Sequence, residues 1–124
     1  MARRRTNPDF LNGVPEMLIL HLLSRRPMYG YELVQAIRES TGEALAFGEG
    51  CVYPLLHRLE ADELLSSERL EVGGRSRVVY RVTKGGAKRL KETVSAWSAV
   101  TEAIRTALGG GALQGGRDVR PALA

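Results

Sequence analysis

The chain has 124 residues, and its 18 Lys and Arg against 14 Asp and Glu give a formal net charge of +4. This length suits one small domain, and 44% hydrophobic with 26% charged residues is a globular composition, which excludes a disordered or fibrous protein. No apolar run approaches the roughly 18 residues that a membrane-spanning helix needs, so a membrane protein is not expected.

Residues that carry out chemistry are scarce in this sequence. The chain has one cysteine, Cys51, and two histidines, His21 and His57, and they do not have the spacing of metal ligands. A lone cysteine cannot form an internal disulfide, and the arginines at residues 3–5 are not followed by the apolar stretch of a secretion signal. The sequence therefore predicts a cytoplasmic protein that is not an enzyme and needs neither a metal nor another cofactor.

Two helices are predicted in the first third of the chain. Pro15 suits the first turn of a helix over residues 14–24, which is apolar on most sides and is therefore expected to be buried on more than one face. After a turn at Pro27, a second helix ends near Gly42, where glycine can adopt a left-handed cap. The apolar face of the second helix consists of Leu33, Val34 and Ile37.

A third helix is predicted after a connector at residues 43–50. Its apolar stripe has the spacing of an amphipathic helix and consists of Val52, Leu55, Leu56 and Leu59. Proline is tolerated only in the first turn of a helix, so Pro54 predicts a start near Gly50 or Cys51. The opposite face consists of Cys51, Tyr53, His57, Arg58 and Ala61. Hydroxyl, imidazole and guanidinium groups contact DNA, so we interpret this helix as a recognition helix.

Two strands joined by a tight turn are predicted next. Residues 65–72 and 75–83 have strand character, and Gly73-Gly74 between them is typical of a hairpin turn. Residues 66–84 include five basic and two acidic side chains, so +3 of the net charge of +4 lies in this segment. The basic residues are Arg69, Arg75, Arg77, Arg81 and Lys84. The hairpin is therefore the basic element of the chain.

The last predicted element is a helix over residues 84–108, capped by Thr83 despite Gly85 and Gly86 in its first turn. Its apolar residues alternate four and three apart, which is the spacing of a helix that pairs with another helix. This seam consists of Leu90, Val94, Trp97, Thr101, Ile104 and Leu108. We therefore predict that the helix mediates dimerisation. The glycine-rich residues 109–124 are expected to form a flexible tail.

The order of these elements predicts the fold. Three helices followed by a two-stranded hairpin are typical of a winged helix-turn-helix, an α+β fold that is mainly α. We expect a basic N-terminal arm at residues 1–12 and a winged helix-turn-helix DNA-binding domain at residues 13–83. The C-terminal dimerisation helix at 84–108 and the tail at 109–124 follow it.

Four segments occur in an order and at a spacing that resemble one known family. They are PEMLIL (15–20), YGYEL (29–33), VYPLLHRLE (52–60) and GRSRVVYRVT (74–83). With these motifs, residues 13–108 resemble the compact branch of the PadR-family transcriptional regulators, which has a single C-terminal dimerisation helix. The resemblance implies a homodimeric, DNA-binding repressor, often one that responds to a ligand.

Two residues depart from the pattern of that family. Cys51 stands where the family usually has Thr or Ser, which removes a hydroxyl that could contact DNA at the start of the third helix. Glu63 stands where many relatives have a glycine that closes this helix in a left-handed conformation. We expect the helix to end at a shifted boundary instead.

The predicted DNA-binding residues are Cys51, Tyr53, His57, Arg58, Arg75 and Arg77. Tyr53 is expected to donate its hydroxyl to a phosphate, while Arg75 and Arg77 flank the hairpin turn, from which long cations reach phosphates or the minor groove. The plainer alternatives are a packing tyrosine, a solvated helix face and an edge strand charged against aggregation. Cys51 is more simply a small packing residue than a reactive thiol whose pKa is lowered by the helix N-terminus.

Trp97 lies in the middle of the seam, where two copies could face each other across a dimer axis. With Val94 and Val100 it would then bind a small aromatic or apolar ligand, and the simpler alternative is an anchor of the dimer core. The predicted function is a repressor that binds an inverted-repeat operator on double-stranded DNA, with recognition helices roughly 34 Å apart, and is released by that ligand. The alternatives are a winged-helix interaction adaptor and a small-molecule-binding protein, neither of which binds DNA.

Overall fold

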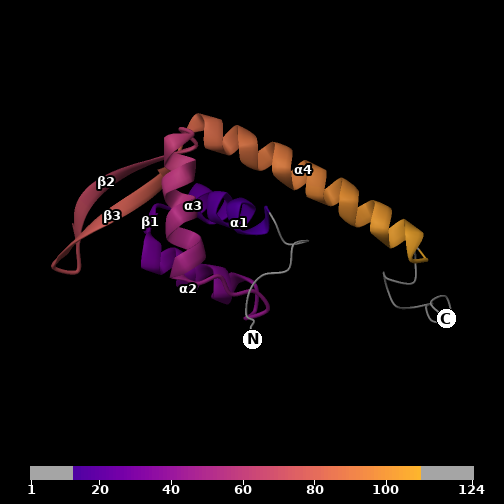
Figure 1. Cartoon of the computed structure of the whole chain (residues 1–124), viewed down its shortest axis with the longest axis horizontal. Helices are drawn as coiled ribbons and strands as arrows, with labels where there is room; N and C mark the ends of the chain where they lie inside the picture. Colours follow the sequence, from indigo (N-terminus) through magenta and orange to yellow (C-terminus); the bar gives the residue numbers. More distant parts are fainter. Residues whose placement is uncertain (1–12, 110–124) are drawn as a thin grey trace. The chain divides into compact units, whose positions relative to one another are not determined.

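The computed structural model describes residues 13–109, which form four helices and three strands (Figure 1). In chain order these are α1 (Val14–Arg25), β1 (Met28–Tyr29), α2 (Gly30–Ser40), α3 (Glu49–Ala61), β2 (Leu65–Val72), β3 (Arg75–Val82) and α4 (Lys84–Ala107). The predicted fold class, a mainly helical winged helix-turn-helix, is confirmed. The basic arm predicted at residues 1–12 and the tail predicted after residue 109 lie outside the described residues.

The chain falls into two compact units, with the boundary between Leu90 and Lys91. The first unit contains α1 to β3 together with the first turns of α4, and the second contains the rest of α4. Across residues 13–109, no helix combines the length and the apolar character that crossing a bilayer requires.

The hydrophobic core of the first unit lies among α1, α2 and α3. The helical side chains with no exposed surface are Ile19, Leu20, Leu33, Ile37, Val52, Leu56 and Leu59. The apolar faces predicted for α2 and α3 therefore point into the core, although Leu55 is partly exposed. Phe47, in the connector before α3, is also buried. Sequence periodicity could not identify Phe47, because it belongs to no helix or strand.

A three-stranded antiparallel sheet, in the order β1-β3-β2, stands beside the helices. The hairpin turns at Gly73-Gly74 as predicted, and Val72 lies opposite Arg75. Gly73 and Gly74 both have positive φ, 59° and 80° respectively, as a two-residue hairpin turn requires. The strand β1 was not predicted, because two residues are too short to show periodicity. It pairs Met28 and Tyr29 with the middle of β3.

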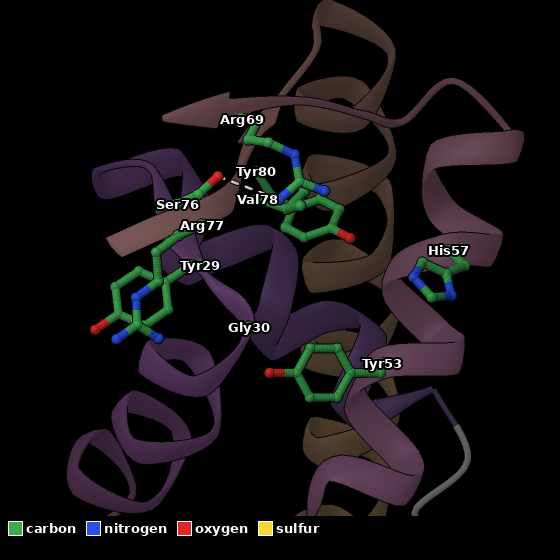
Figure 2. A pocket seen from close by; sticks show the side chains of 9 residues that line it. All are labelled: Tyr29, Gly30, Tyr53, His57, Arg69, Ser76, Arg77, Val78 and Tyr80. Atoms are coloured by element: carbon green, nitrogen blue, oxygen red, sulfur yellow. Dashed lines mark hydrogen bonds between the residues drawn. The ribbon is translucent and has the colours of Figure 1, made fainter. Parts of the chain in front are cut away.

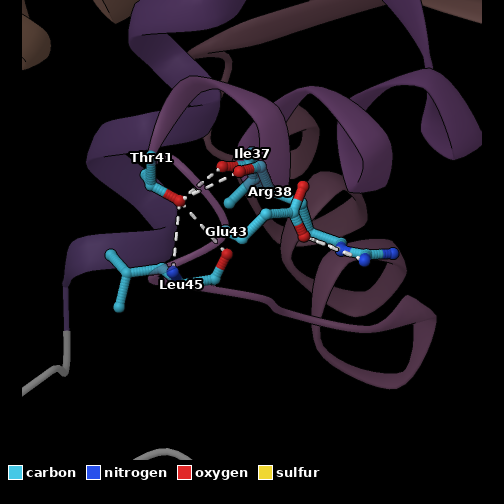
Figure 3. Close-up of polar contacts among 5 residues, drawn as sticks. All are labelled: Ile37, Arg38, Thr41, Glu43 and Leu45. Carbon is cyan, nitrogen blue, oxygen red and sulfur yellow. Dashed lines mark hydrogen bonds and ion pairs between the residues drawn. The ribbon is translucent and has the colours of Figure 1, made fainter.

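The connector from α2 to α3 is held by polar contacts at its first residues (Figure 3). Gly42 ends α2 with a φ of 61°, which confirms the predicted left-handed cap. The Thr41 hydroxyl donates to the Ile37 carbonyl at 2.9 Å and accepts from the Leu45 amide at 3.1 Å. Glu43 also has positive φ, and its carboxylate pairs with Arg38 at 2.9 Å. These contacts fix the path of the chain into α3.

Both ends of α3 differ from the sequence-based expectation. The helix begins at Glu49, earlier than predicted, so that Pro54 lies in its second turn rather than its first. Pro54 has no N–H for the Gly50 carbonyl, but Gly50 is exposed and water can supply the missing hydrogen bond.

The expected shift at the C-terminal end of α3 is wrong. Glu63 adopts the left-handed conformation itself, with a φ of 64°. Its amide donates to the Glu60 carbonyl, and the Leu64 amide donates to the Leu59 carbonyl, both at 2.9 Å. These two bonds are those of a glycine-terminated helix end. The hydrogen bonds and the burial of Leu64 outweigh the steric penalty of a non-glycine residue here.

The start of α4 is tied to the end of α3. The Thr83 hydroxyl accepts the Gly86 amide at 3.0 Å, which confirms the predicted cap, and donates to the Glu63 carbonyl at 2.8 Å. Gly86 is buried so closely against the Leu64 carbonyl that a Cβ atom would overlap it. Glycine at this position therefore serves close packing, although it lowers helix propensity.

Candidate nucleic-acid interface

A cleft of about 300 Å³ lies between α3 and the hairpin (Figure 2). It is lined by Tyr29, Gly30, Tyr53, His57, Arg69, Ser76, Arg77, Val78 and Tyr80. Tyr53 and His57 are four residues apart and therefore share one face of α3. Three of the predicted DNA-binding residues, Tyr53, His57 and Arg77, are thus brought together in one cleft.

Tyr53 occupies its place because residue 30 is a glycine. A Cβ atom on Gly30 would overlap the Tyr53 ring and would lie 2.8 Å from its hydroxyl oxygen. Gly30 is buried as the first residue of α2, so the ring packs directly on the backbone where α2 begins. Only part of the Tyr53 side chain is exposed. Tyr53 therefore packs against α2 and also retains some exposed surface.

The hairpin register selects the residues that complete the cleft. Arg69 lies opposite Val78 and Ser67 opposite Tyr80, so Arg69 and Tyr80 share one face of the sheet. On this face the Arg69 guanidinium donates to the Ser76 hydroxyl at 3.3 Å. Arg69, Ser76 and Tyr80 were not identified as site residues from the sequence. The two-residue turn at Gly73-Gly74 fixes the register, and alternation from that turn predicts that these three residues share one face but not that this face meets α3.

Tyr80 is a tyrosine that is almost completely buried beside the cleft, with 4% of its surface exposed. Burial raises the pKa of the Tyr80 phenol, and the neighbouring Glu60 and Tyr53 raise the pKa further. The phenol therefore remains protonated at neutral pH, and it adds a hydrogen-bond donor rather than a negative charge to the cleft.

Arg77 is held by an aromatic ring rather than by a carboxylate. Its guanidinium carbon lies 4.3 Å from the centroid of the Tyr29 ring, and Figure 2 shows the two side chains stacked. The Arg77 Nε is buried and has no hydrogen-bond partner among the described residues. Stacking orients the guanidinium while leaving its charge available for an anion. Arg75 is exposed beside the turn.

The hairpin presents cations without nearby compensation. Within the described segment, no carboxylate lies within ion-pair distance of Arg69, Arg75 or Arg77, whereas Arg81 pairs with Glu68 at 3.8 Å. No Asp or Glu is among the residues that line the cleft. Hydroxyl, imidazole and guanidinium donors in a lining without a carboxylate suit the phosphate backbone of a nucleic acid.

The other three predicted DNA-binding residues, Arg58, Cys51 and Arg75, lie outside the lining of the cleft. The Arg58 guanidinium is 3.0 Å from a carboxylate oxygen of Glu16 on α1. Cys51 is half-buried, and burial raises the pKa of its thiol. This direction favours the interpretation of Cys51 as a small packing residue over that of a reactive thiol. Among residues 13–109, no three His, Cys, Asp or Glu side chains gather so that they could hold a metal ion.

The seam on α4 exposes most of its apolar side chains. Val94, Ile104 and Leu108 are 45%, 52% and 54% exposed, and Trp97 is half-buried. A shallow pocket of about 120 Å³ is lined by Ala96, Trp97 and Val100. Trp97 and Val100 of the predicted ligand site therefore lie together, whereas Val94 is not part of the pocket lining.

Comparison with known proteins identifies relatives of the whole described fold. The profile of the family described as "Transcriptional regulator PadR-like family" matches residues 19–92. The chain is 38% identical over 102 residues to the protein named transcriptional regulator Rv3488 of Mycobacterium tuberculosis, covering 82% of this chain and 90% of that protein. It is 32% identical over 114 residues to transcriptional regulator YqjI of Escherichia coli, covering 92% of this chain but 54% of that protein.

Solved structures show the same architecture. A transcriptional regulator from Clostridium thermocellum matches with a TM-score of 0.74 at 29% identity, covering 80% of this chain and 97% of that one. A PadR-like transcriptional regulator from Bacillus cereus matches with a TM-score of 0.73 at 30% identity, covering 83% and 99% of the two chains. These relatives are transcriptional regulators and not enzymes.

Proposed function

Because the chain belongs to the PadR-like family of transcriptional regulators, we propose that it is a homodimeric repressor that binds an inverted-repeat operator on double-stranded DNA. The observation that supports this proposal is the cleft between α3 and the hairpin. Its lining contains hydrogen-bond donors from both elements and no carboxylate. A surface of this kind suits DNA, whose backbone is a dense array of negative charge.

In this proposal α3 enters the major groove and the hairpin binds the adjacent backbone. Tyr53 donates its hydroxyl to a phosphate, and His57, which is exposed on the same face of α3, contacts base edges. Arg77, preoriented on the Tyr29 ring, and Arg75 at the turn bind phosphates. The phosphate contacts supply affinity and register, while α3 supplies sequence preference.

The exposed seam on α4 supports the proposal of a homodimer. Apolar side chains at Val94, Ile104 and Leu108 are spaced for pairing with a second helix, and such a contact would remove them from water. The pocket beside Trp97 supports the further proposal that a small aromatic or apolar ligand binds at this interface. Such a ligand relieves repression only by binding one dimer geometry more tightly than another.

The first experiment measures DNA binding by fluorescence anisotropy. The wild-type chain is titrated against a labelled duplex from upstream of its own coding region and against a scrambled duplex, at about 0.15 M salt, where non-specific binding is weak. Tight binding to the upstream duplex alone supports a repressor that regulates its own gene. An absence of binding to either duplex, even at low salt, contradicts the proposal and favours an interaction adaptor.

The same assay tests the role of the hairpin. Arg75→Ala with Arg77→Ala should weaken binding to every sequence and should reduce the magnitude of the slope of log K against log salt by about four, because a dimer loses two phosphate contacts in each protomer and the counterion release that those contacts cause. The matched control is Arg25→Ala with Lys88→Ala, which removes two exposed cations that do not line the cleft. A slope that both double variants change equally contradicts a specific role of the hairpin.

The Trp97 pocket is tested separately. Flat aromatic compounds should quench the fluorescence of this single tryptophan and should weaken binding to the upstream duplex over the same concentration range. Quenching by compounds in a chain that binds no duplex would instead favour a small-molecule-binding protein.

A further inference from the structure

Three charged side chains from three different helices meet near the C-terminal end of α3. One carboxylate oxygen of Glu16, on α1, is 3.0 Å from the Arg58 guanidinium on α3, and the other is 2.8 Å from the Arg89 guanidinium on α4. We refer to Glu16, Arg58 and Arg89 as the Glu16 cluster. All three residues belong to the first compact unit.

The carboxylate is the least exposed member of the Glu16 cluster. The Glu16 side chain is 14% exposed, whereas those of Arg58 and Arg89 are 61% and 44% exposed. A charge with so little access to water depends on its protein partners, whereas the two guanidinium groups retain much of their hydration. Glu16 therefore determines where the two arginines are held, rather than the reverse.

The direction of Arg58 separates it from the residues of the cleft. Successive residues of a helix are rotated by about 100° about its axis, so Arg58 lies on a different face of α3 from the one that carries Tyr53 and His57. Its pairing with Glu16 fixes α3 on the side that faces α1. Arg89 lies just before the boundary at Lys91, beyond which α4 carries the exposed part of its seam.

We propose that Glu16 is a positioning residue for DNA recognition, which holds α3 through Arg58 and the start of α4 through Arg89. In this arrangement the carboxylate sets the orientation in which α3 presents Tyr53 and His57, and Arg58 acts as an internal tie instead of a phosphate ligand. This inference rests on the proposed function, because it concerns how the chain distinguishes one DNA sequence from another.

The test compares specific with non-specific binding in the full-length chain. Two duplexes of equal length are used, the tightest-binding one that the wild-type chain selects from a random-sequence library and one of mixed sequence. The variants are Glu16→Gln and Arg58→Ala. The matched control is Glu39→Gln, which changes the net charge as Glu16→Gln does, at an exposed α2 carboxylate that has no ion-pair partner in the part of the chain that the structure describes.

Glu16→Gln and Arg58→Ala should each lower the ratio of specific to non-specific affinity by about tenfold, and Glu39→Gln should leave the ratio unchanged. The ratio distinguishes positioning from simple destabilisation, since partial unfolding lowers the active fraction for both duplexes equally. The salt dependence of Arg58→Ala should match that of the wild-type chain, because an internal tie releases no counterions.

Three results would overturn this inference. If Arg58→Ala reduces the magnitude of the salt slope by about two, one for each protomer of the dimer, and weakens both duplexes equally, Arg58 is a phosphate ligand. If Glu16→Gln behaves like Glu39→Gln, the Glu16 cluster is an ordinary surface ion pair. If the wild-type chain itself selects no duplex, the proposed function fails together with this inference, and this result differs from the others because no variant is needed to see it.

Discussion

The two compact units differ in what they do with their apolar side chains. The first unit has a core in which residues such as Leu56 have no exposed surface. Within residues 91–109, by contrast, no residue is buried, and Ile104 near the C-terminal end of the seam is 52% exposed. Most helical stability in proteins comes from tertiary packing, so the first unit contains its own stabilisation. The second unit has the exposed, regularly spaced apolar residues of a helix that is stabilised by a partner.

The largest expected effect is in the core. Leu56→Ala should lower the free energy of unfolding by about 3 kcal/mol, because it removes buried methyl groups and leaves a cavity. Ile104→Ala removes a similar side chain from the seam and should leave the unfolding of a diluted chain nearly unchanged, while it weakens self-association. Urea denaturation at low protein concentration and sedimentation equilibrium measure the two quantities. Equal destabilisation by both variants at low concentration would show that the seam already has a partner within its own chain.

The next effect lies at the beginning of α4, which starts in the first unit and continues into the second. Gly86→Ala should lower the free energy of unfolding by about 2 kcal/mol, because its Cβ overlaps the Leu64 carbonyl, which is backbone and cannot turn aside. Gly85→Ala is the matched control, since the nearest atoms lie 3.7 Å from its Cβ. It should raise stability by roughly 0.5–1 kcal/mol through helix propensity. Thermal denaturation of both variants measures the difference, and the same sign for both would contradict it.

A smaller gain is expected where α3 ends. Glu63→Gly should raise the free energy of unfolding by about 1 kcal/mol, because glycine adopts positive φ without steric strain. Glu43 also has positive φ, but Glu43→Gly should gain less, since it removes the ion pair with Arg38. Chemical denaturation at neutral pH compares the two variants. A loss of stability in Glu63→Gly would show that the Glu63 side chain contributes more than its conformation costs.

The smallest expected effect is a loss of stability of the first unit at alkaline pH. Burial raises the pKa of Cys51 and of Tyr80 from the ordinary values of 9.0 and 10.0. The folded chain then holds these protons more tightly than the unfolded chain. This contribution to stability is present below those ordinary values and is lost as the pH rises through the raised ones. Cys51→Ala and Tyr80→Phe should each flatten the decline in melting temperature above pH 9.0, and a decline that neither substitution changes would contradict this origin.

Strong local signals made most of the fold predictable. The glycine pair at 73–74 placed the hairpin, whose strands end within one residue of the prediction, and Thr83 placed the start of α4. The strand β1 could not be predicted, because its two residues pair with β3 about fifty residues later. The starting position of α3 was missed because the expectation confined Pro54 to the first turn, whereas an exposed Gly50 carbonyl tolerates it in the second.

The candidate site was predictable only where one element carries it. Tyr53 and His57 follow from the polar face of a single helix. Arg69 and Tyr80 depend on which strand face meets α3, and that choice follows from register and packing together. The surroundings of Arg58 are set by Glu16, which is 42 residues earlier in the chain. No local pattern reports a contact over such a separation.

The packing of Gly30 against Tyr53 restricts how this chain can evolve. Any side chain gained at position 30 displaces the aromatic ring, so a single mutation there would disturb the start of α2 and the packing of α3 together. A smaller residue at position 53 would remove this constraint, but it would also remove the phenol from the cleft. The two positions are therefore expected to change as a pair during divergence, and descendants that keep the tyrosine should keep the glycine.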